Sequence, residues 1–127
     1  MRKVLIAEDE LVSRTLLKEV VEKMGLVAVT ASNGRRALEL LDDNADFALL
    51  ITDAKMPEMD GRELLQALRA KGAEGQVPVI MVSGVVGPNY IHELLENGVT
   101  RFLPKPLDLA MLREYVNRSL KREDHQK

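Results

Sequence analysis

The sequence contains no cysteine and no tryptophan among its 127 residues. The lack of cysteine excludes a disulfide scaffold, a thiolate metal site and a cysteine nucleophile. Neither sign of charge is in excess, because 18 basic residues stand against 20 acidic ones and the formal net charge is -2. This balance gives no electrostatic footprint for nucleic acid. We therefore expect no direct binding of nucleic acid.

Long hydrophobic runs are also lacking. The first apolar run, residues 4–7, ends at the acidic residues Glu8, Asp9 and Glu10. A signal peptide needs an apolar stretch of roughly 7–15 residues, and a membrane-spanning helix needs about 20. We therefore expect a cytoplasmic protein with no membrane insertion. Hydrophobic residues make up 46% of the chain, which is enough for the core of a single domain of this length.

Short apolar runs alternate with amphipathic helical patterns along the chain. The runs lie at residues 4–7, 26–29, 48–51, 79–82 and 100–103. Continuous apolar runs are typical of strands that are buried on both faces of a parallel sheet. Apolar residues at helical spacing follow each run, so the sequence predicts five strand–helix units.

The predicted helices carry start and stop signals. Asp60, with Glu63 three residues later, predicts a capping box at the third helix. Pro88 fits the first turn of the fourth helix, and Gly98 fits its end. The other signals are Gly25 after the first helix, residues 32–34 before the second and Asp108 before the fifth.

The edge strands of the sheet are expected to be the less apolar ones. The fifth run carries Arg101 and ends at Pro104, which cannot donate to a strand ladder, so it suits an edge. The second run is the other edge candidate, although its sequence alone does not show it, and an order of 2-1-3-4-5 satisfies both placements. The predicted fold is therefore α/β and flavodoxin-like, a doubly wound five-stranded parallel sheet with five helices. We place the domain at residues 1–121 and expect a polar C-terminal tail at 122–127.

Polar residues collect where the predicted strands end. Glu8 and Asp9 follow the first strand and Asp53 follows the third, so this strand order brings three carboxylates together. Two unit charges about 4 Å apart cost about 4 kcal/mol at an effective dielectric near 20, so protons or a cation must relieve the repulsion. Carboxylate oxygens with no cysteine or nearby histidine favour Mg²⁺ or Mn²⁺. Ser83 and Lys105 follow the fourth and fifth strands, and their hydroxyl and positive charge suit a phosphoryl group that a carboxylate attacks.

These residues resemble the receiver domains of two-component response regulators, including the CheY-like ones. The resemblance runs from about Arg2 to Leu120, and its motifs stand in order at predicted strand ends. The motifs are Glu8-Asp9, residues 53–61, Ser83-Gly84 and residues 102–106. The resemblance implies a single-domain response regulator in two-component or phosphorelay signal transduction. Such a protein is a phosphorylatable switch, and it catalyses only its own phosphorylation and dephosphorylation.

The resemblance implies that Asp53 is the phospho-acceptor. It would take a phosphoryl group from a sensor histidine kinase or a histidine phosphotransfer protein and form an aspartyl phosphate. Glu8, Asp9 and Asp53 would bind Mg²⁺ (or Mn²⁺), with the backbone carbonyl of Lys55 as a further ligand. Glu8 replaces the commoner Asp of the family, and its longer side chain is expected to reach the metal ion directly or through water.

The resemblance also assigns residues to the new phosphoryl group. Ser83 would hydrogen-bond it, Lys105 would pair with it, and Gly84 would leave room for its approach. Phe102 would be the switch aromatic that moves inward when Ser83 shifts, without the phenolic hydroxyl of the Tyr found in some members. The peptide bond between Lys105 and Pro106 would be cis, as in the family.

Two positions are expected to set the lifetime of the phosphoryl group. Lys55 lies two residues after Asp53, and Val85 lies two residues after Ser83. Neither side chain is a carboxylate or an amide that orients an attacking water molecule. The hypothesis is therefore a long-lived phosphoryl group.

Phosphorylation is expected to change contacts on one face of the domain. The fourth helix, the fifth strand and the fifth helix would form this face and bind a downstream target protein. A phosphorylation-dependent homodimer is a second partner that this face could take. The residues expected there are Tyr90, Arg101, Phe102 and Tyr115.

Four alternatives are weighed against this reading. The chain could be the receiver fragment of a longer response regulator, or a pseudo-receiver that is never phosphorylated; Asp53, Lys105 and the acidic pair Glu8-Asp9 argue against the latter. A phosphatase of the haloacid dehalogenase type has a second Asp where Lys55 stands. A flavodoxin-like FMN binder needs phosphate-cradling residues after the first strand, where residues 8–10 are acidic.

Overall fold

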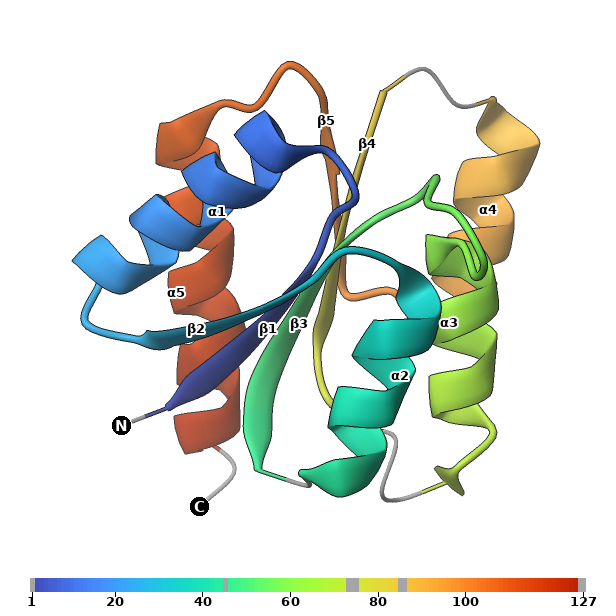
Figure 1. Ribbon diagram of the computed structural model, residues 1–127, viewed down its shortest axis with the longest axis horizontal. Helices are drawn as coiled ribbons and strands as arrows, with labels where there is room; N and C mark the ends of the chain where they lie inside the picture. Colours follow the sequence, from blue (N-terminus) through green and yellow to red (C-terminus); the bar gives the residue numbers. More distant parts are fainter. Residues whose placement is uncertain (1, 45, 73–75, 85–86, 126–127) are drawn as a thin grey trace.

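Five parallel strands form a central sheet, and five helices cover its two faces (Figure 1). These numbers refer to residues 2–44, 46–72, 76–84 and 87–125, which the computed structural model describes; for 122–125 it describes the backbone. The elements are β1 (Lys3–Ala7), α1 (Leu11–Lys23), β2 (Val27–Ala31), α2 (Gly34–Asp43), β3 (Phe47–Asp53), α3 (Gly61–Arg69), β4 (Val79–Ser83), α4 (Pro88–Glu96), β5 (Arg101–Pro104) and α5 (Leu109–His125).

The strand order is β2-β1-β3-β4-β5, and every neighbouring pair is parallel. This confirms the predicted flavodoxin-like order. The two edge strands are partly exposed, whereas β3 and β4 are buried at every residue. The register pairs Asp53 with Val82 and Ser83 with Pro104, so the carboxyl ends of β3, β4 and β5 lie level at one edge of the sheet.

Side chains alternate between the two faces of the sheet, as the pleat of a strand requires. Val4 and Ile6 pack in the core under α1 and α5, and Leu5 and Ala7 pack in the core under α2, α3 and α4. Figure 1 shows the same division, with α1 and α5 on one side of the sheet and the other three helices on the opposite side. The continuous apolar runs are therefore explained by burial on both faces.

Local sequence signals set the helix ends. Asp60 and Glu63 form the predicted capping box, in which each side chain accepts from the other residue's backbone N–H, at 2.8 and 3.0 Å. Asn33 caps α2 by accepting from the backbone N–H of Arg36 at 2.8 Å. Pro88 begins α4. The glycines after α1 and α4 have the positive φ angles of helix termini: Gly25 at 81° and Gly98 at 85°.

The last helix extends further than expected. The sequence-based boundary at residue 121 falls inside α5, which continues to His125. Arg122 and Glu123, which follow residue 121, are types that favour a helix, so the polar composition that suggested a tail is also compatible with an exposed helix end. Residues 126–127 of the expected tail lie outside the described residues.

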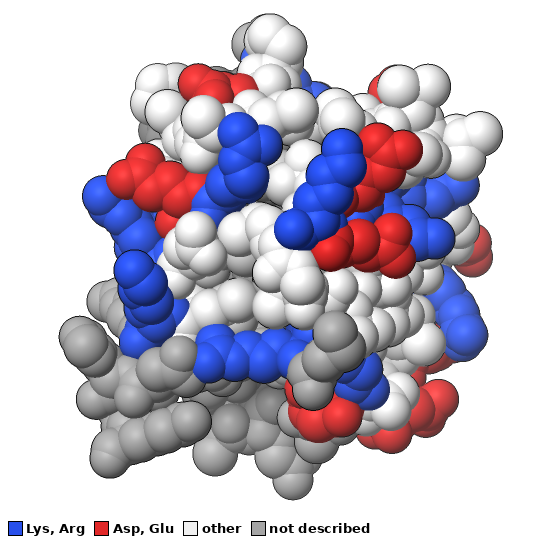
Figure 2. All heavy atoms as spheres, turned by 90° about the vertical axis from the view of Figure 1, so that its left-hand side faces the viewer, with Lys and Arg blue, Asp and Glu red and all other residues white. Residues whose placement is uncertain are grey.

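Charges of both signs are interspersed on the side of the molecule that carries α1 and α5. Figure 2 shows Lys and Arg side chains among Asp and Glu side chains there, with uncharged residues between them. No helix in the described part of the chain has the length and apolar character needed to cross a membrane.

Candidate functional site

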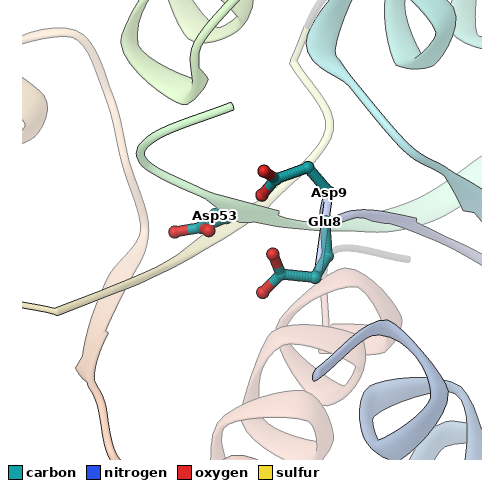
Figure 3. Close-up of side chains that lie close together, drawn as sticks. All are labelled: Glu8, Asp9 and Asp53. Atoms are coloured by element: carbon teal, nitrogen blue, oxygen red, sulfur yellow. The ribbon is translucent and has the colours of Figure 1, made fainter. Parts of the chain in front are cut away.

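Three carboxylates meet at the carboxyl ends of β1 and β3. Asp53 is the last residue of β3, and Glu8 and Asp9 directly follow β1. One oxygen atom from each of the three lies within 4.8 Å of the others. Figure 3 shows the side chains of Glu8 and Asp9 pointing to the side on which Asp53 lies. Glu8 is fully buried and Asp53 is 8% exposed, whereas Asp9 is exposed.

Lys105 reaches two of these carboxylates from β5's side of the sheet. Its Nζ lies 3.0 Å from Oε1 of Glu8 and 3.3 Å from Oδ2 of Asp53. Its backbone N–H donates to the carbonyl of Ser83 at 2.7 Å, which ties the residue to the end of β4. The other oxygen of Asp53, Oδ1, accepts from the backbone N–H of Ala54 at 2.7 Å. Each oxygen of Asp53 therefore has its own donor.

The protonation of Glu8 responds to this environment. Burial raises its pKa from 4.5 to about 7 and the negative charge of Asp53 adds to the rise, against hydrogen bonds from Lys105 and the backbone N–H of Glu10, which lower it. For Lys105, burial lowers the pKa, but its hydrogen bonds and attraction to Glu8 and Asp53 outweigh burial and raise it above the usual value. The site thus favours a charged lysine and resists a third full negative charge.

The loop after β3 lies close against Asp53. The backbone N–H of Gly61 donates to the carbonyl of Ala54 at 2.8 Å, which folds the loop back over the strand end. A Cβ atom on Gly61 would stand 2.3 Å from the carbonyl oxygen of Asp53, so only glycine fits there without a shift of the backbone. The side chain of Lys55 is exposed at the start of this loop.

The remaining predicted site residues surround the cluster. Ser83 ends β4 and is 2% exposed, and Gly84 is exposed with open space where a side chain would be. Phe102 is half-buried on β5 and packs against the core under α2, α3 and α4. The peptide bond between Lys105 and Pro106 is cis, as predicted. Val85 lies outside the described residues.

Two contacts at the site were missed from the sequence. The backbone N–H of Ala54 carries no sequence signal at all, because every residue except proline has one. Arg14 of α1 donates from Nη1 to the carbonyl oxygens of Glu8 at 3.0 Å and Asp9 at 3.2 Å. Its position one turn into the predicted first helix was the only available signal, and it did not show which way the side chain points.

The predicted output face carries a cation–π contact. The guanidinium of Arg101 on β5 lies 5.3 Å from the ring centre of Tyr115 on α5. Tyr90 on α4 packs, like Phe102, against the core under α4, and burial raises the pKa of its hydroxyl. The Arg101–Tyr115 contact joins β5 and α5 at the face that the sequence singled out.

The donor set fits a hard divalent cation. Three carboxylates converge, and in the described part of the chain Lys105 is the one cation that pairs with them. A net negative charge therefore remains when all three carboxylates are ionised, and every side-chain atom that would bind a metal ion here is an oxygen. Mg²⁺ and Mn²⁺ prefer such ligands.

Comparison with known proteins gives the family. The family model of the response regulator receiver domain matches residues 4–117 of this chain. The chain belongs to this family, and its sheet order and five helices are those of CheY-like receivers. It is thus a receiver domain of the two-component signalling type.

Several relatives support the assignment. The chain is 34% identical to the chemotaxis protein CheY1 of Helicobacter pylori strain J99 over 113 residues, which cover 88% of this chain and 91% of that protein. It is 32% identical to the two-component response regulator ORR3 of Oryza sativa subsp. indica, over 91% of this chain and 88% of that protein. A crystal structure of a response regulator receiver protein from Pseudomonas putida is similar with a TM-score of 0.86 and 32% identity, over 92% of this chain and 96% of that one.

Proposed function

We propose that this receiver domain accepts a phosphoryl group on Asp53 from a sensor histidine kinase or a histidine phosphotransfer protein, in the cytoplasm. The observation that carries the proposal is the position of the Asp53 carboxylate. It lies among two further carboxylates and within 3.3 Å of the Lys105 ammonium, at the open end of the sheet. A carboxylate in that place has a positive charge beside it to stabilise a phosphoryl group, and it lies where a phosphoryl donor can approach.

The proposed transfer is a displacement at phosphorus. A carboxylate oxygen of Asp53 attacks the phosphorus of a phosphohistidine, a P–O bond forms, and the P–N bond breaks. The imidazole nitrogen leaves with the electron pair of that bond and takes a proton from solvent. The Ala54 N–H holds one oxygen of Asp53, which orients the other. Lys105 then pairs with the oxygens of the new phosphoryl group.

A divalent cation completes the proposal. Glu8, Asp9 and Asp53, with the backbone carbonyl of Lys55, are the residues that would hold Mg²⁺ or Mn²⁺. When bound, the cation supplies positive charge where the anionic carboxylate and the anionic phosphoryl group approach each other. The receiver domain of sensor histidine kinase PA1611 from Pseudomonas aeruginosa, which shares this fold, has a magnesium ion coordinated in its active-site cleft.

The phosphoryl group is proposed to switch the face formed by α4, β5 and α5. Ser83 hydrogen-bonds the phosphoryl group, and Phe102 moves inward as Ser83 shifts. A downstream protein, or a second copy of the chain, then binds the changed face. Chemical-shift mapping with a phosphate mimic such as beryllofluoride tests this: we expect changes at Arg101 and Tyr115, and changes confined to the vicinity of Asp53 would contradict it.

We also propose that the phosphoryl group is long-lived. Lys55 is exposed beside the site and does not orient water as an amide or carboxylate does. The same argument applies to Val85, from the sequence alone. The dephosphorylation rates of Lys55→Asn and Val85→Glu test the idea. Acceleration in either variant is expected, and unchanged rates in both would overturn it.

The acceptor chemistry has a direct test. The protein is incubated with acetyl phosphate and Mg²⁺, and its intact mass is measured. We expect the gain of one phosphoryl group, loss of that gain when the metal is chelated, and no gain in Asp53→Asn. If phosphorylated histidine kinases and phosphotransfer proteins also leave the mass unchanged, the chain is a pseudo-receiver and the proposal fails.

A further inference from the structure

The turn between β1 and α1 carries two of the three carboxylates, and the side chain of Arg14 holds two of its backbone carbonyl groups. Arg14 lies in the second turn of α1, with its own N–H donating to the carbonyl of Glu10 at 2.9 Å. Its side chain folds back over the turn, where Nη1 donates to the carbonyl oxygens of Glu8 and Asp9 at 3.0 and 3.2 Å. The guanidinium therefore ties two successive peptide groups of the acidic turn to the helix.

The three carboxylates differ in how they are held. Glu8 accepts from Lys105 at 3.0 Å and from the backbone N–H of Glu10 at 3.2 Å. Asp53 accepts from Lys105 at 3.3 Å and from the backbone N–H of Ala54 at 2.7 Å. Among the described residues, no donor holds the carboxylate of Asp9. The position of this carboxylate thus depends on the backbone of its own turn.

The exposed carboxylate of Asp9 faces repulsion from its two neighbours, because like charges a few ångströms apart repel. A free turn could relieve this repulsion by rotating its peptide groups and swinging Asp9 into solvent. The strand side of the turn is fixed, since the N–H of Glu8 donates to the carbonyl of Ala31 at 3.0 Å. On the helix side the turn is held by Arg14. Its guanidinium is charged, and a charged hydrogen-bond donor binds carbonyl oxygens more strongly than a neutral donor does.

We propose that Arg14 is a positioning residue of the metal site: by holding the carbonyls of Glu8 and Asp9, it keeps the Asp9 carboxylate within reach of the ion that Glu8 and Asp53 bind. This inference rests on the proposed function, because it assigns a purpose to a contact with the proposed metal ligands. Arg14 does not touch the ion or the phosphoryl group. It acts through the backbone of Asp9, as outer residues around metal ligands generally do.

Calorimetric titration of the intact chain with Mg²⁺ alone tests the proposal. Arg14→Met keeps most of the side-chain volume and removes the donors, and Arg14→Lys keeps the charge without the planar fork. We expect Arg14→Met to weaken Mg²⁺ binding about tenfold, within the usual range for outer-shell partners, and Arg14→Lys to lie between it and the parent protein. The control is Arg118→Met on α5, which removes an exposed arginine paired with Glu114 and should bind Mg²⁺ as the parent does.

A double-mutant cycle with Asp9→Asn separates positioning from a general loss of structure. If Arg14 acts through Asp9, adding Arg14→Met to Asp9→Asn changes the Mg²⁺ affinity by less than about twofold. If Arg14 only stabilises the fold, Arg14→Met weakens binding equally in both backgrounds, and the proposal is overturned. Far-UV circular dichroism checks folding, and if Arg14→Met is unfolded, Arg14→Lys carries the same cycle.

The outcomes separate the two proposals. In the first outcome the parent protein binds Mg²⁺, and Arg14→Met binds it with an affinity within about twofold of the parent's. This overturns the role of Arg14 and leaves the proposed function standing. No binding of Mg²⁺ by the parent protein overturns the metal-dependent function itself, and the role of Arg14 with it. Weakened binding that depends on Asp9 supports both.

Discussion

Glu8 departs from the ordinary behaviour of a glutamate side chain. It is fully buried, it accepts from Lys105, and its pKa is raised to about 7. A proton on Glu8 relieves the repulsion among the three carboxylates, and so does a bound cation. Protons and Mg²⁺ are therefore expected to compete for this one side chain.

This competition predicts a pH-dependent affinity for Mg²⁺. Glu8 must lose its proton to bind the ion, so the affinity should be constant above a pH of about 7 and fall about tenfold per unit below it. Calorimetric titrations across this range measure the dependence. Glu8→Gln should bind more weakly and lose most of the slope, and a parent protein whose affinity is flat across the range would contradict the assignment.

At the scale of elements, α2 braces the loop that follows Asp53. The backbone N–H of Gly34 donates to the carbonyl of Met59 at 3.1 Å, and Asn33 donates to the carboxylate of Glu58 at 3.2 Å. Glu58 has a φ of 66°, which side-chain-bearing residues rarely adopt. The two contacts from α2 therefore hold a loop conformation that its own sequence disfavours.

The close approach of Gly34 to the carbonyl of Met59 predicts that a Gly-to-Ala substitution there destabilises the protein, contrary to the usual effect in a helix. Gly-to-Ala substitution within a helix normally stabilises by about 0.5–1 kcal/mol. At Gly34 the new Cβ would stand 2.1 Å from the carbonyl oxygen of Met59. We therefore expect Gly34→Ala to lower the free energy of unfolding by about 1–3 kcal/mol in urea denaturation, because the loop or the helix must move.

A matched glycine provides the control. Gly87 precedes α4, and apart from its chain neighbours no atom of the described residues lies within 4 Å of a Cβ built on it. Gly87→Ala should change the free energy of unfolding by less than about 1 kcal/mol. A stability of Gly34→Ala equal to or above that of the parent protein would show that the contact with Met59 yields easily.

The elements themselves were largely predictable, because their signals are local. The capping box of Asp60 and Glu63 and the edge position of β5 followed from residue types at fixed spacings, and burial on both faces left continuous apolar runs. The hydrogen bonds from Arg14 to the backbone of Glu8 and Asp9 and the positive φ of Glu58 could not be predicted from the sequence. They depend on a side-chain direction and on tertiary contacts that residue type does not encode, and the helical end of α5 was hidden by a polar composition that tails share.

At the scale of the whole molecule, apolar side chains lie exposed beside the acidic site. Leu11 and Val12, at the start of α1, are 65% and 75% exposed and directly follow the acidic turn. We propose that these two side chains contact a protein partner, because exposed apolar patches are typical of such contacts. A protein donor that brings its phosphohistidine to Asp53 would cover these residues.

This placement predicts a difference between protein and small-molecule donors. Val12→Glu should slow phosphotransfer from a phosphorylated histidine kinase about tenfold, because a charge would be buried in the contact. It should leave phosphorylation by acetyl phosphate unchanged, since Val12 is not one of the residues that form the acidic cluster. Leu95→Glu makes the same change on exposed α4, and equal slowing by both variants would argue against a specific contact at α1.

The identity of the phosphorylated residue is the central claim, and it can be read directly. Protein treated with acetyl phosphate and Mg²⁺ is reduced with borohydride, which converts an aspartyl phosphate to homoserine, and is then digested and sequenced by tandem mass spectrometry. The account predicts homoserine in place of Asp53, and no conversion when the metal is chelated. Conversion at a different aspartate, or phosphate found on another residue type, would contradict it.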